Sequence, residues 1–299
     1  MRSILRIPVI FHRALLRAVD HDCFNLAQSS AYSGIVAIFP ALIVAATIIS
    51  LLPDTTPIRY QLGIFFDRIL PPDVTPLLGT YFGPSTHNPK STRALILALL
   101  VSVTGASSVI STLMEGIRRS HNLPPDCWTF WSRRARAYAL VPLSLIPFGV
   151  ASLMIVFGDF FTGWLALHLI PSVRTPIYVF AILIRWTVAL TGNIGIVALI
   201  YHMGTPFRQP WRTVLPGAVA ATFMWFVTTL IFGWYVTRFA NYSQVYGSLG
   251  AGIALLFWLY IVSLSVLFGS EFNHEFRIHF SHPIQPYSTV STPDMPSHG

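Results

Sequence analysis

Charged residues are scarce in this sequence. Asp, Glu, Lys and Arg make up only 10% of the 299 residues, whereas 54% are hydrophobic and the mean hydropathy is +0.62. Soluble domains carry about 25% charged residues, so too few charges remain here to coat a water-soluble globule. The composition therefore excludes an ordinary soluble fold and predicts that lipid surrounds most of the chain.

Cysteine and lysine are nearly absent as well. The two cysteines, Cys23 and Cys127, belong to no C-x-x-C pair, so the sequence predicts no disulfide framework and no metal or redox site. One lysine accompanies 18 arginines and 11 acidic residues, which leaves a net charge of +8. In a membrane protein this excess indicates topology before nucleic-acid binding, because basic loops are retained in the cytoplasm.

Constellations typical of enzymes are missing too. Acidic residues are scattered over loops and termini, whereas a nuclease needs several carboxylates to hold its metal ions. The sequence has no P-loop. An intramembrane serine protease needs a histidine beside its serine, yet Ser248 and His202 are expected at opposite faces of the membrane, and His168 has no orienting partner. We therefore expect no enzymatic activity, no catalytic residue and no cofactor.

Long apolar runs, in contrast, are abundant. A spanning helix needs about 20 apolar residues, and six windows satisfy this: 31–52, 94–114, 137–158, 177–201, 213–237, and part of 239–270. We predict an all-α polytopic membrane protein with a bundle of six transmembrane helices. It comprises an N-terminal segment 1–30, a transmembrane domain 31–280 and a disordered tail 281–299 rich in Pro, Ser and Thr.

The basic residues are unevenly distributed between the windows. One side collects 12 Lys and Arg residues, in segments 1–30, 115–136, 202–212 and 271–299, and the other side collects six. Because the more positive side faces the cytoplasm, both termini are predicted to be cytoplasmic. The apolar run 4–11 is short and interrupted, so we expect a retained first helix and no cleaved signal peptide.

The first outer loop contains an amphipathic pattern within 57–82. Apolar side chains recur there at helical spacing, at Ile58, Leu62, Phe65, Phe66 and Ile69. The pattern favours an outer amphipathic helix on the membrane surface. A re-entrant hairpin is the alternative, provided that its backbone is buried in protein.

Arg185 is the one charged residue inside a window. It lies about 12 Å below the outer end of the fourth window, because each helical residue rises about 1.5 Å. A charge at such depth is costly and often functional. Three interpretations stay open: binding of an anionic headgroup, an ion pair with Asp159, or snorkelling to the interface.

Polar side chains also line two of the windows. Thr104, Ser108 and Thr112 recur every four residues along one side of the second window, and Asn193 lies at depth in the fourth. Such a face suits a ligand-binding cavity. Ordinary helix packing explains it equally, since hydroxylated and small residues let helices approach closely.

Small residues and a proline suggest two places of close packing or gating. Gly247, Gly250 and Gly252 open the sixth helix in small-xxx-small spacing, which favours a tight seam between helices. Pro40 lies inside the first helix, where it removes a backbone hydrogen bond and favours a kink. A static shape and a movable gate are both compatible with these residues.

Three titratable residues follow the sixth window at intervals of four. Glu271, Glu275 and His279 fall on one helical face, a spacing that a metal site can use. No second ligand cluster accompanies them, so a solvated helix end is the preferred interpretation and no metal is expected.

Ordered motifs across the chain resemble the YihY/BrkB family. They are Ala31-Tyr32, Phe39-Pro40, Tyr201, Pro206, Trp211, Pro216-Gly217-Ala218, Trp225, Tyr235, Tyr246-Gly247-Ser248-Leu249-Gly250, Trp258-Leu259-Tyr260 and Gly269-Ser270-Glu271-Phe272-Asn273. Ser270 departs from the family, which more often has Ala there. The resemblance implies a multi-pass protein of the bacterial inner membrane, and it supplies no catalytic residue.

Three functions follow as hypotheses. The first is a membrane protein that binds or transports an envelope-related amphiphile such as an anionic lipid, through Arg185 and the polar faces. The second is a scaffold for envelope proteins. The third is ribonuclease activity, a label formerly attached to this family. Membrane lipids are the expected partners, a homo-oligomer stays open, and nucleic acid is not expected.

Overall fold

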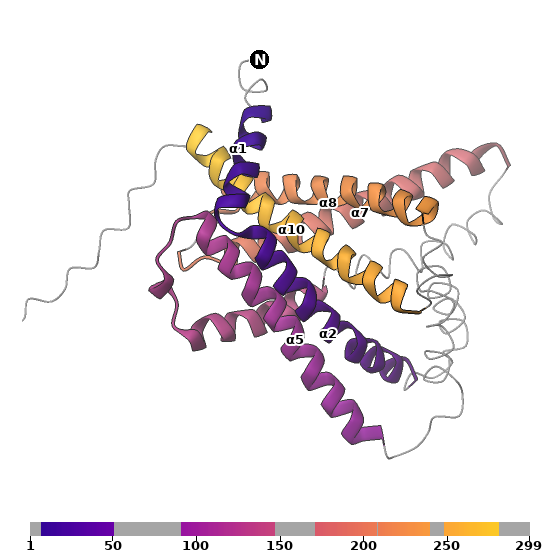
Figure 1. Ribbon diagram of the computed structural model, residues 1–299. Helices are drawn as coiled ribbons and strands as arrows, with labels where there is room; N and C mark the ends of the chain where they lie inside the picture. The colour runs from indigo at the N-terminus through magenta and orange to yellow at the C-terminus, as the bar shows by residue number, and fades with distance from the viewer. Residues whose placement is uncertain (1–6, 51–90, 147–170, 208, 240–247, 281–299) are drawn as a thin grey trace, which may run out of the picture.

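Helices form all the regular structure that can be described. The computed structural model describes residues 7–50, 91–146, 171–207, 209–239 and 248–280, and no strand occurs among them. Besides helical residues 130–146 and a 3₁₀ turn at Pro125–Cys127, the elements are α1 (Ile7–Asp20), α2 (Cys23–Ser50), α5 (Ser91–Ser120), α7 (Pro171–Met203), α8 (Trp211–Phe239) and α10 (Ser248–Phe280) (Figure 1). The all-α prediction is confirmed.

Five of these helices are long and apolar enough to cross a membrane. The spans, within the described residues, are Cys23–Val44, Leu95–Ser120, Ile182–Met203, Trp211–Val236 and Gly252–Phe280. They correspond to five of the six predicted windows, which confirms a polytopic membrane protein. Helix 130–146 enters the remaining window, 137–158, whose second half lies outside the described residues. The predicted amphipathic helix within 57–82 and the tail 281–299 also lie outside them.

The spanning helices are apolar around most of their circumference. Large hydrophobic side chains stay uncovered by protein, for example Phe223 at 66%, Leu97 at 63% and Ile231 at 60% exposure. Water would make such a surface unfavourable, whereas lipid tails are as apolar as these side chains. The exposed apolar surface is therefore the face that contacts the bilayer.

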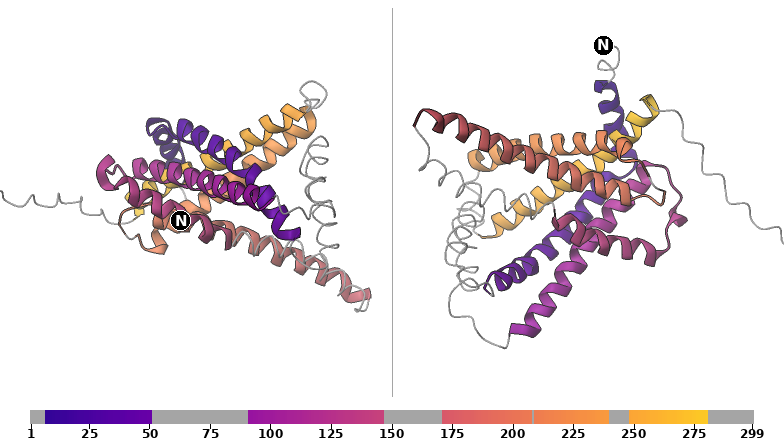
Figure 2. Two further views of the ribbon diagram at one scale, coloured as in Figure 1. Left: turned by 90° about the horizontal axis from the view of Figure 1, so that it is seen from below. Right: turned by 180° about the vertical axis from the view of Figure 1, so that it is seen from behind.

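The helices pack around a shared core of small and large apolar residues. α2 packs on α5 and α10, α8 packs on α7 and α10, and α1 packs on α10. The central cluster includes Tyr201, Val214, Ala218 and Leu267, all nearly inaccessible. Figures 1 and 2 show that the helices approach one another closely near α1 and spread toward their other ends.

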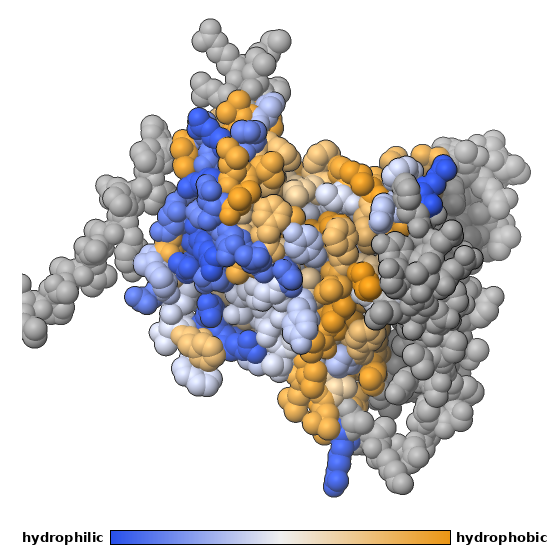
Figure 3. Space-filling view, viewed as in Figure 1, coloured by the Kyte–Doolittle hydropathy of each residue, from blue (hydrophilic) through white to orange (hydrophobic). Residues whose placement is uncertain are grey.

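α1 is the element that the sequence analysis did not anticipate. Its buried residues Ile10 and Ala14 pack against Phe268 and Phe272 of α10. Hydrophilic residues gather over this end of the molecule, whereas hydrophobic ones cover the helices beyond it (Figure 3). We call this region the polar end. It is where α1 meets the ends of α2, α5 and α10, and it includes residues 121–136, which follow α5, and residues 204–207 and 209–210.

Candidate functional site

A tight turn at Asp22 folds α1 back onto α10. Asp22 adopts a left-handed conformation (φ 65°), which Asp and Asn tolerate better than most residues. Its backbone carbonyl accepts from the amide of Leu26 at 3.1 Å, and its side chain accepts from Asn25 Nδ2 at 2.7 Å. The turn ends α1, starts α2 and places the residues on either side of it, His21 and Cys23, over α10.

The centre of the polar end is a buried carboxylate. Glu271 of α10 is completely inaccessible, and its Oε1 lies 2.7 Å from His21 Nδ1 and 4.0 Å from Cys23 Sγ. Its second oxygen, Oε2, is buried and has no hydrogen-bond partner among the described residues. Burying an ionised carboxylate with so few partners is costly. The few partners of Glu271 therefore distinguish it from an ordinary ion-paired carboxylate.

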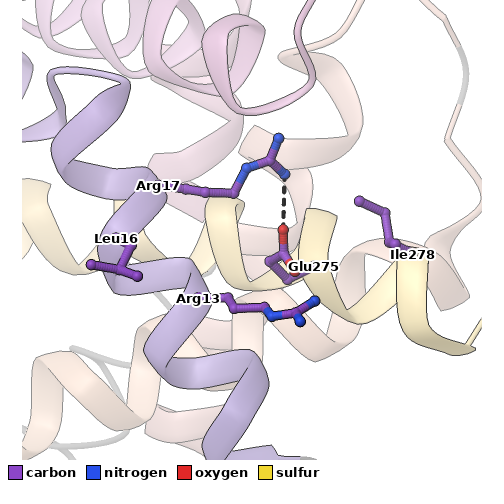
Figure 4. A pocket seen from close by; sticks show the side chains of 5 residues that line it. All are labelled: Arg13, Leu16, Arg17, Glu275 and Ile278. Atoms are coloured by element: carbon purple, nitrogen blue, oxygen red, sulfur yellow. Dashed lines mark hydrogen bonds and ion pairs between the residues drawn. The ribbon is translucent and has the colours of Figure 1, made fainter.

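A second carboxylate lies one helical turn further along α10. Arg17 Nη1 donates to Glu275 Oε1 at 3.0 Å, and Arg13 Nη1 lies 3.2 Å from His279 Nε2. A pocket of about 350 Å³ opens between α1 and α10, lined by Arg13, Leu16, Arg17, Glu275 and Ile278 (Figure 4). Both guanidinium groups reach toward α10, so the pocket combines positive charge with aliphatic surface.

A polar chain links the end of α5 to the segment between α7 and α8. Gln209 Nε2 lies 2.9 Å from His121 Nε2, and His202 Nδ1 lies 2.6 Å from the carbonyl oxygen of Gln209. On the other side of its ring, His121 Nδ1 lies 2.9 Å from Ile117 O. An amide nitrogen only donates and a carbonyl only accepts, so the geometry assigns a neutral His121 with its proton on Nδ1.

The surroundings of His121 favour this neutral form. Burial lowers the pKa of His121 to about 4, and the nearby Arg277 adds to the effect. The ring also meets His274 of α10 edge-on, with centroids 5.7 Å apart. The neutral form that burial favours is thus the one that contacts Gln209 and His274.

Arginine side chains surround a third carboxylate at the end of α5. Glu115 accepts from Arg118 at 2.7 Å and from Arg119 and Arg133 at 3.3 Å each. Arg119 Nη1 also lies 3.6 Å from Asp22 Oδ2 in the turn. This carboxylate is satisfied on several sides and ties the start of helix 130–146 and the α1–α2 turn to α5.

The predicted hydroxyl face lies on α5. Ser108 Oγ donates to the backbone oxygen of Thr104 at 3.0 Å, and Thr112 Oγ1 donates to that of Ser108 at 3.0 Å. Ser108 Oγ also accepts from Arg134 Nη1 at 3.2 Å. None of these residues lines the pocket at α1, and their role in ligand binding stays a prediction.

The two predicted polar residues of α7 lie apart from the polar end. Asn193 Nδ2 donates to Thr222 Oγ1 of α8 at 3.1 Å, a contact expected of helix packing. Arg185 belongs to α7, but its side chain lies outside the described residues. Headgroup binding, an ion pair and snorkelling all stay open for Arg185.

The residues predicted for packing or gating occupy two helices. Pro40 lies inside α2, and Gly250 is buried near the start of α10. No described atom lies within 4 Å of the position that a Cβ would take at Gly252, and Gly247 lies outside the described residues. Whether this seam opens stays a prediction.

A tighter crossing occurs at the opposite end of α10. A Cβ added to Gly269 would lie 2.5 Å from Ala221 Cβ, 2.5 Å from Tyr201 Oη and 2.6 Å from the carbonyl oxygen of Gly217. The Tyr201 hydroxyl donates to the backbone oxygen of Val266 in the same place. Glycine is required here by close approach of the backbones. Gly217 and Gly269 both occur in the family-like motifs, a signal that could have located this crossing.

The interpretation of a solvated helix end is wrong for Glu271 and Glu275, whereas His279 is half-buried. Glu271 is 0% and Glu275 6% exposed, because α1 covers this face of α10. The sequence spacing placed them on one face, but it gave no sign that α1 would fold over them. In the part of the chain that the structure describes, no three His, Cys, Asp or Glu side chains are grouped to hold a metal ion.

Comparison with known proteins finds relatives along almost the whole chain. Residues 14–288 match the family model described as virulence factor BrkB. "Putative ribonuclease-like protein YfkH" of Bacillus subtilis is 26% identical over 253 residues, which cover 85% of this chain and 90% of that protein. UPF0761 membrane proteins of Tolumonas auensis and Alteromonas mediterranea are each 27% identical, over 86% and 88% of this chain and 82% and 86% of those proteins. No solved structure matches significantly.

The matched region contains most of the polar end, but not the first seven residues of α1, which include Arg13. It begins within α1 and extends beyond α10, so it includes all five described spans. Two of the relatives are named as membrane proteins, in agreement with the apolar helices described above. The resemblance seen in the sequence motifs is confirmed, and the chain belongs to the virulence factor BrkB family of polytopic membrane proteins.

Proposed function

We propose that this protein binds an anionic amphiphile, such as an anionic lipid, in the bacterial inner membrane and moves it between two positions. The observation that supports the proposal is the pocket between α1 and α10, with two guanidinium groups beside aliphatic side chains. Among the described residues that line the pocket, Arg13 and Arg17 are accompanied by one carboxylate, Glu275, so an anionic headgroup would balance the remaining positive charge. Guanidinium groups suit phosphate because their planar fork offers paired donors.

The surroundings of the pocket suit a molecule with an apolar tail. α1 exposes Phe11, Leu15, Leu16 and Val19 in addition to its buried face. A helix with apolar and basic residues exposed together is typical of the membrane interface, where it contacts tails and headgroups at once. A ligand in the pocket would therefore meet lipid on one side and the polar end on the other.

The orientation of the protein is part of the proposal. Arg13, Arg17, Arg118, Arg119, Arg133, Arg134, Arg136, Arg212 and Arg277 belong to segments that the sequence analysis assigns to the cytoplasm. α1 and the end of α10 contact each other through Arg17 and Glu275, so the two ends of the described chain share one side. By the positive-inside rule, we place the polar end and both termini in the cytoplasm.

Arg13→Gln tests the pocket. The purified full-length protein is titrated with phosphatidylglycerol and, separately, with zwitterionic phosphatidylcholine in detergent. We expect about a tenfold loss of affinity for phosphatidylglycerol, equivalent to about 1.4 kcal/mol, because one cationic contact is removed. Arg238→Gln, a change at the opposite end of the spans, is the matched control and should bind as the wild type does.

Equal affinity for the two lipids, or an equal loss in Arg13→Gln and Arg238→Gln, would contradict the proposal. The predicted contacts elsewhere are tested in the same assay with Arg185→Ala and Ser108→Leu. If these two variants leave lipid binding unchanged, the contribution assigned to Arg185 and Ser108 is rejected.

A scaffold for envelope proteins is the second candidate. Its supporting observation is an aromatic pair at the polar end, Phe130 and Trp131, of which Trp131 is 76% exposed. A scaffold predicts that changes at this pair or removal of 281–299 reduce capture of partner proteins, while Arg13→Gln has no effect on capture. The amphiphile proposal predicts that Arg13→Gln reduces lipid binding, whereas changes at the aromatic pair or removal of 281–299 leave lipid binding unchanged.

A further inference from the structure

Glu271 is held differently from the other carboxylates of the polar end. Its oxygen Oε1 has His21 Nδ1 at 2.7 Å, and its oxygen Oε2 is buried without a partner in the described chain. Glu115, by contrast, contacts three arginines, and Glu275 contacts Arg17. Among the described residues no guanidinium is paired with Glu271, so its charge is not balanced there in the way that the other two charges are.

The described arginines around Glu271 are engaged with other carboxylates. The charged and titratable neighbours from the elements packed against it are Arg17 of α1, His21 and Asp22 of the turn, Cys23 of α2, Arg119 of α5, Tyr201 of α7, and His274 and Glu275 of α10. α8 meets α10 here through the neutral Gly217 and Ala221. Arg17 is bound to Glu275, and Arg119 is shared between Glu115 and Asp22.

A proton can balance the charge that no arginine balances. The 2.7 Å separation between His21 Nδ1 and Glu271 Oε1 is a hydrogen-bond distance, so one of the two atoms carries a hydrogen. If His21 is neutral and donates from Nδ1, a net negative charge is left in a site without exposure. If His21 is protonated and donates from Nδ1, the two residues form an ion pair whose carboxylate is completely inaccessible. If the carboxyl group carries the proton and donates to Nδ1, both residues are neutral, which burial favours over a pair of charges.

We propose that Glu271 is a proton-binding site, in which the carboxyl group carries the proton and donates it to His21 Nδ1. The bound proton joins the α1–α2 turn to α10, because it removes the charge that would otherwise be buried between them. Release of the proton leaves an anionic pair and weakens this contact. The inference goes beyond the proposed function, since it requires no amphiphile.

Infrared difference spectroscopy of the full-length protein tests the site. Spectra are recorded between about pH 5 and pH 8, and the carboxylic-acid carbonyl band is followed. We expect a band in the wild type that decreases as pH rises and that is lost in Glu271→Gln. Glu115→Gln is the matched control, because Glu115 lies at the same end but is ionised among arginines, so this variant should keep the band.

His21→Phe provides a second assignment should Glu271→Gln fail to fold. Loss of the imidazole acceptor should shift the band, since the carboxyl group can no longer donate to Nδ1. A wild-type protein without the band, or a band unchanged in both Glu271→Gln and His21→Phe, overturns the proposal. Lipid binding is not measured in this experiment, so its outcome is separate from that of the Arg13→Gln titration.

Discussion

His121 links the stability of the polar end to pH at the level of one residue. Its folded-state pKa of about 4 lies below the ordinary value of 6.5. Above about pH 6.5 the imidazole is neutral in both the folded and unfolded states, and the contribution of its hydrogen bonds is complete. Between about pH 6.5 and 4 the unfolded chain binds a proton that the folded chain does not. The free energy of unfolding therefore decreases as pH falls through this interval.

We therefore expect His121 to lower the thermal midpoint as pH falls from about 7.5 to 4.5, seen by tryptophan fluorescence in detergent as the difference between the wild type and His121→Gln. His121→Gln should be less stable at neutral pH, because its bonds to Gln209 and Ile117 are altered, but its midpoint should depend less on pH. His12→Gln, at an exposed position on α1, serves as the comparison. An identical pH dependence in all three proteins would contradict the role of His121.

The sequence could not reveal this group of residues. Glu271, Glu275 and His279 were found by their spacing, but their partners come from positions about 250 residues earlier in the chain, as for His21 and Glu271. Spacing identifies neighbours within one helix only. Pairing between α1 and α10 depends on the left-handed turn at Asp22, and the local sequence pattern did not predict this turn.

At the scale of elements, the crossing of α8 and α10 gives a sharp prediction. Gly269→Ala should destabilise the protein by about 1–3 kcal/mol, because the added methyl group would meet Ala221, Tyr201 and Gly217 at distances too short for carbon contacts. Unfolding in detergent by heat or denaturant measures the change.

Gly252→Ala is the control on the same helix. Its added methyl group would meet no described atom within 4 Å, and alanine favours a helix over glycine by about 0.5–1 kcal/mol. We expect it to be neutral or slightly stabilising. If Gly252→Ala destabilises as much as Gly269→Ala, close approach at the crossing is not the reason that Gly269 is needed.

Helix ends show where the element predictions were incomplete. α2 begins at Cys23, not at residue 31, and α10 continues to Phe280, not to 270. The windows were delimited by apolar residues, whereas the helices continue into the polar end. α1 was missed because it is short and amphipathic, although Ile10, Ala14 and Ala18 recur at the spacing of a buried helical face.

For the whole molecule, orientation can be tested with the natural cysteines. Cys127 is partly exposed at the polar end, whereas Cys23 is buried. A membrane-impermeant maleimide should label Cys127 in inside-out vesicles and leave it unlabelled in intact spheroplasts, because we place the polar end in the cytoplasm. The readout is a mass shift of the full-length protein.

Arg238→Cys in a Cys127→Ser background reports the opposite side. Arg238 is exposed near the end of α8, far along that helix from the polar end. This cysteine should be labelled in spheroplasts and protected in inside-out vesicles. The reverse pattern for the two cysteines would invert the topology and move the proposed pocket to the outer face.

The general architecture was predictable because burying a charge in hydrocarbon is costly, so membrane-spanning segments can be recognised from the sequence as long uncharged stretches. Uncharged windows located all five described spans, and the distribution of arginine suggested an orientation. The polar end was not predictable in the same way. It is assembled from α1, the Asp22 turn, the end of α5 and the segment 204–210, and each of these has a different local sequence pattern.

The glycine crossing has a mechanical consequence. The backbones of α8 and α10 come into contact at Gly217 and Gly269. α10 begins at Ser248, which precedes Gly269 in the helix. Because each residue adds about 1.5 Å along a helix, Ser248 lies about 30 Å from Gly269, and a tilt of about 5° would carry it through roughly 3 Å. If α10 pivots at this crossing, the displacement of its residues would therefore grow with their distance from Gly269.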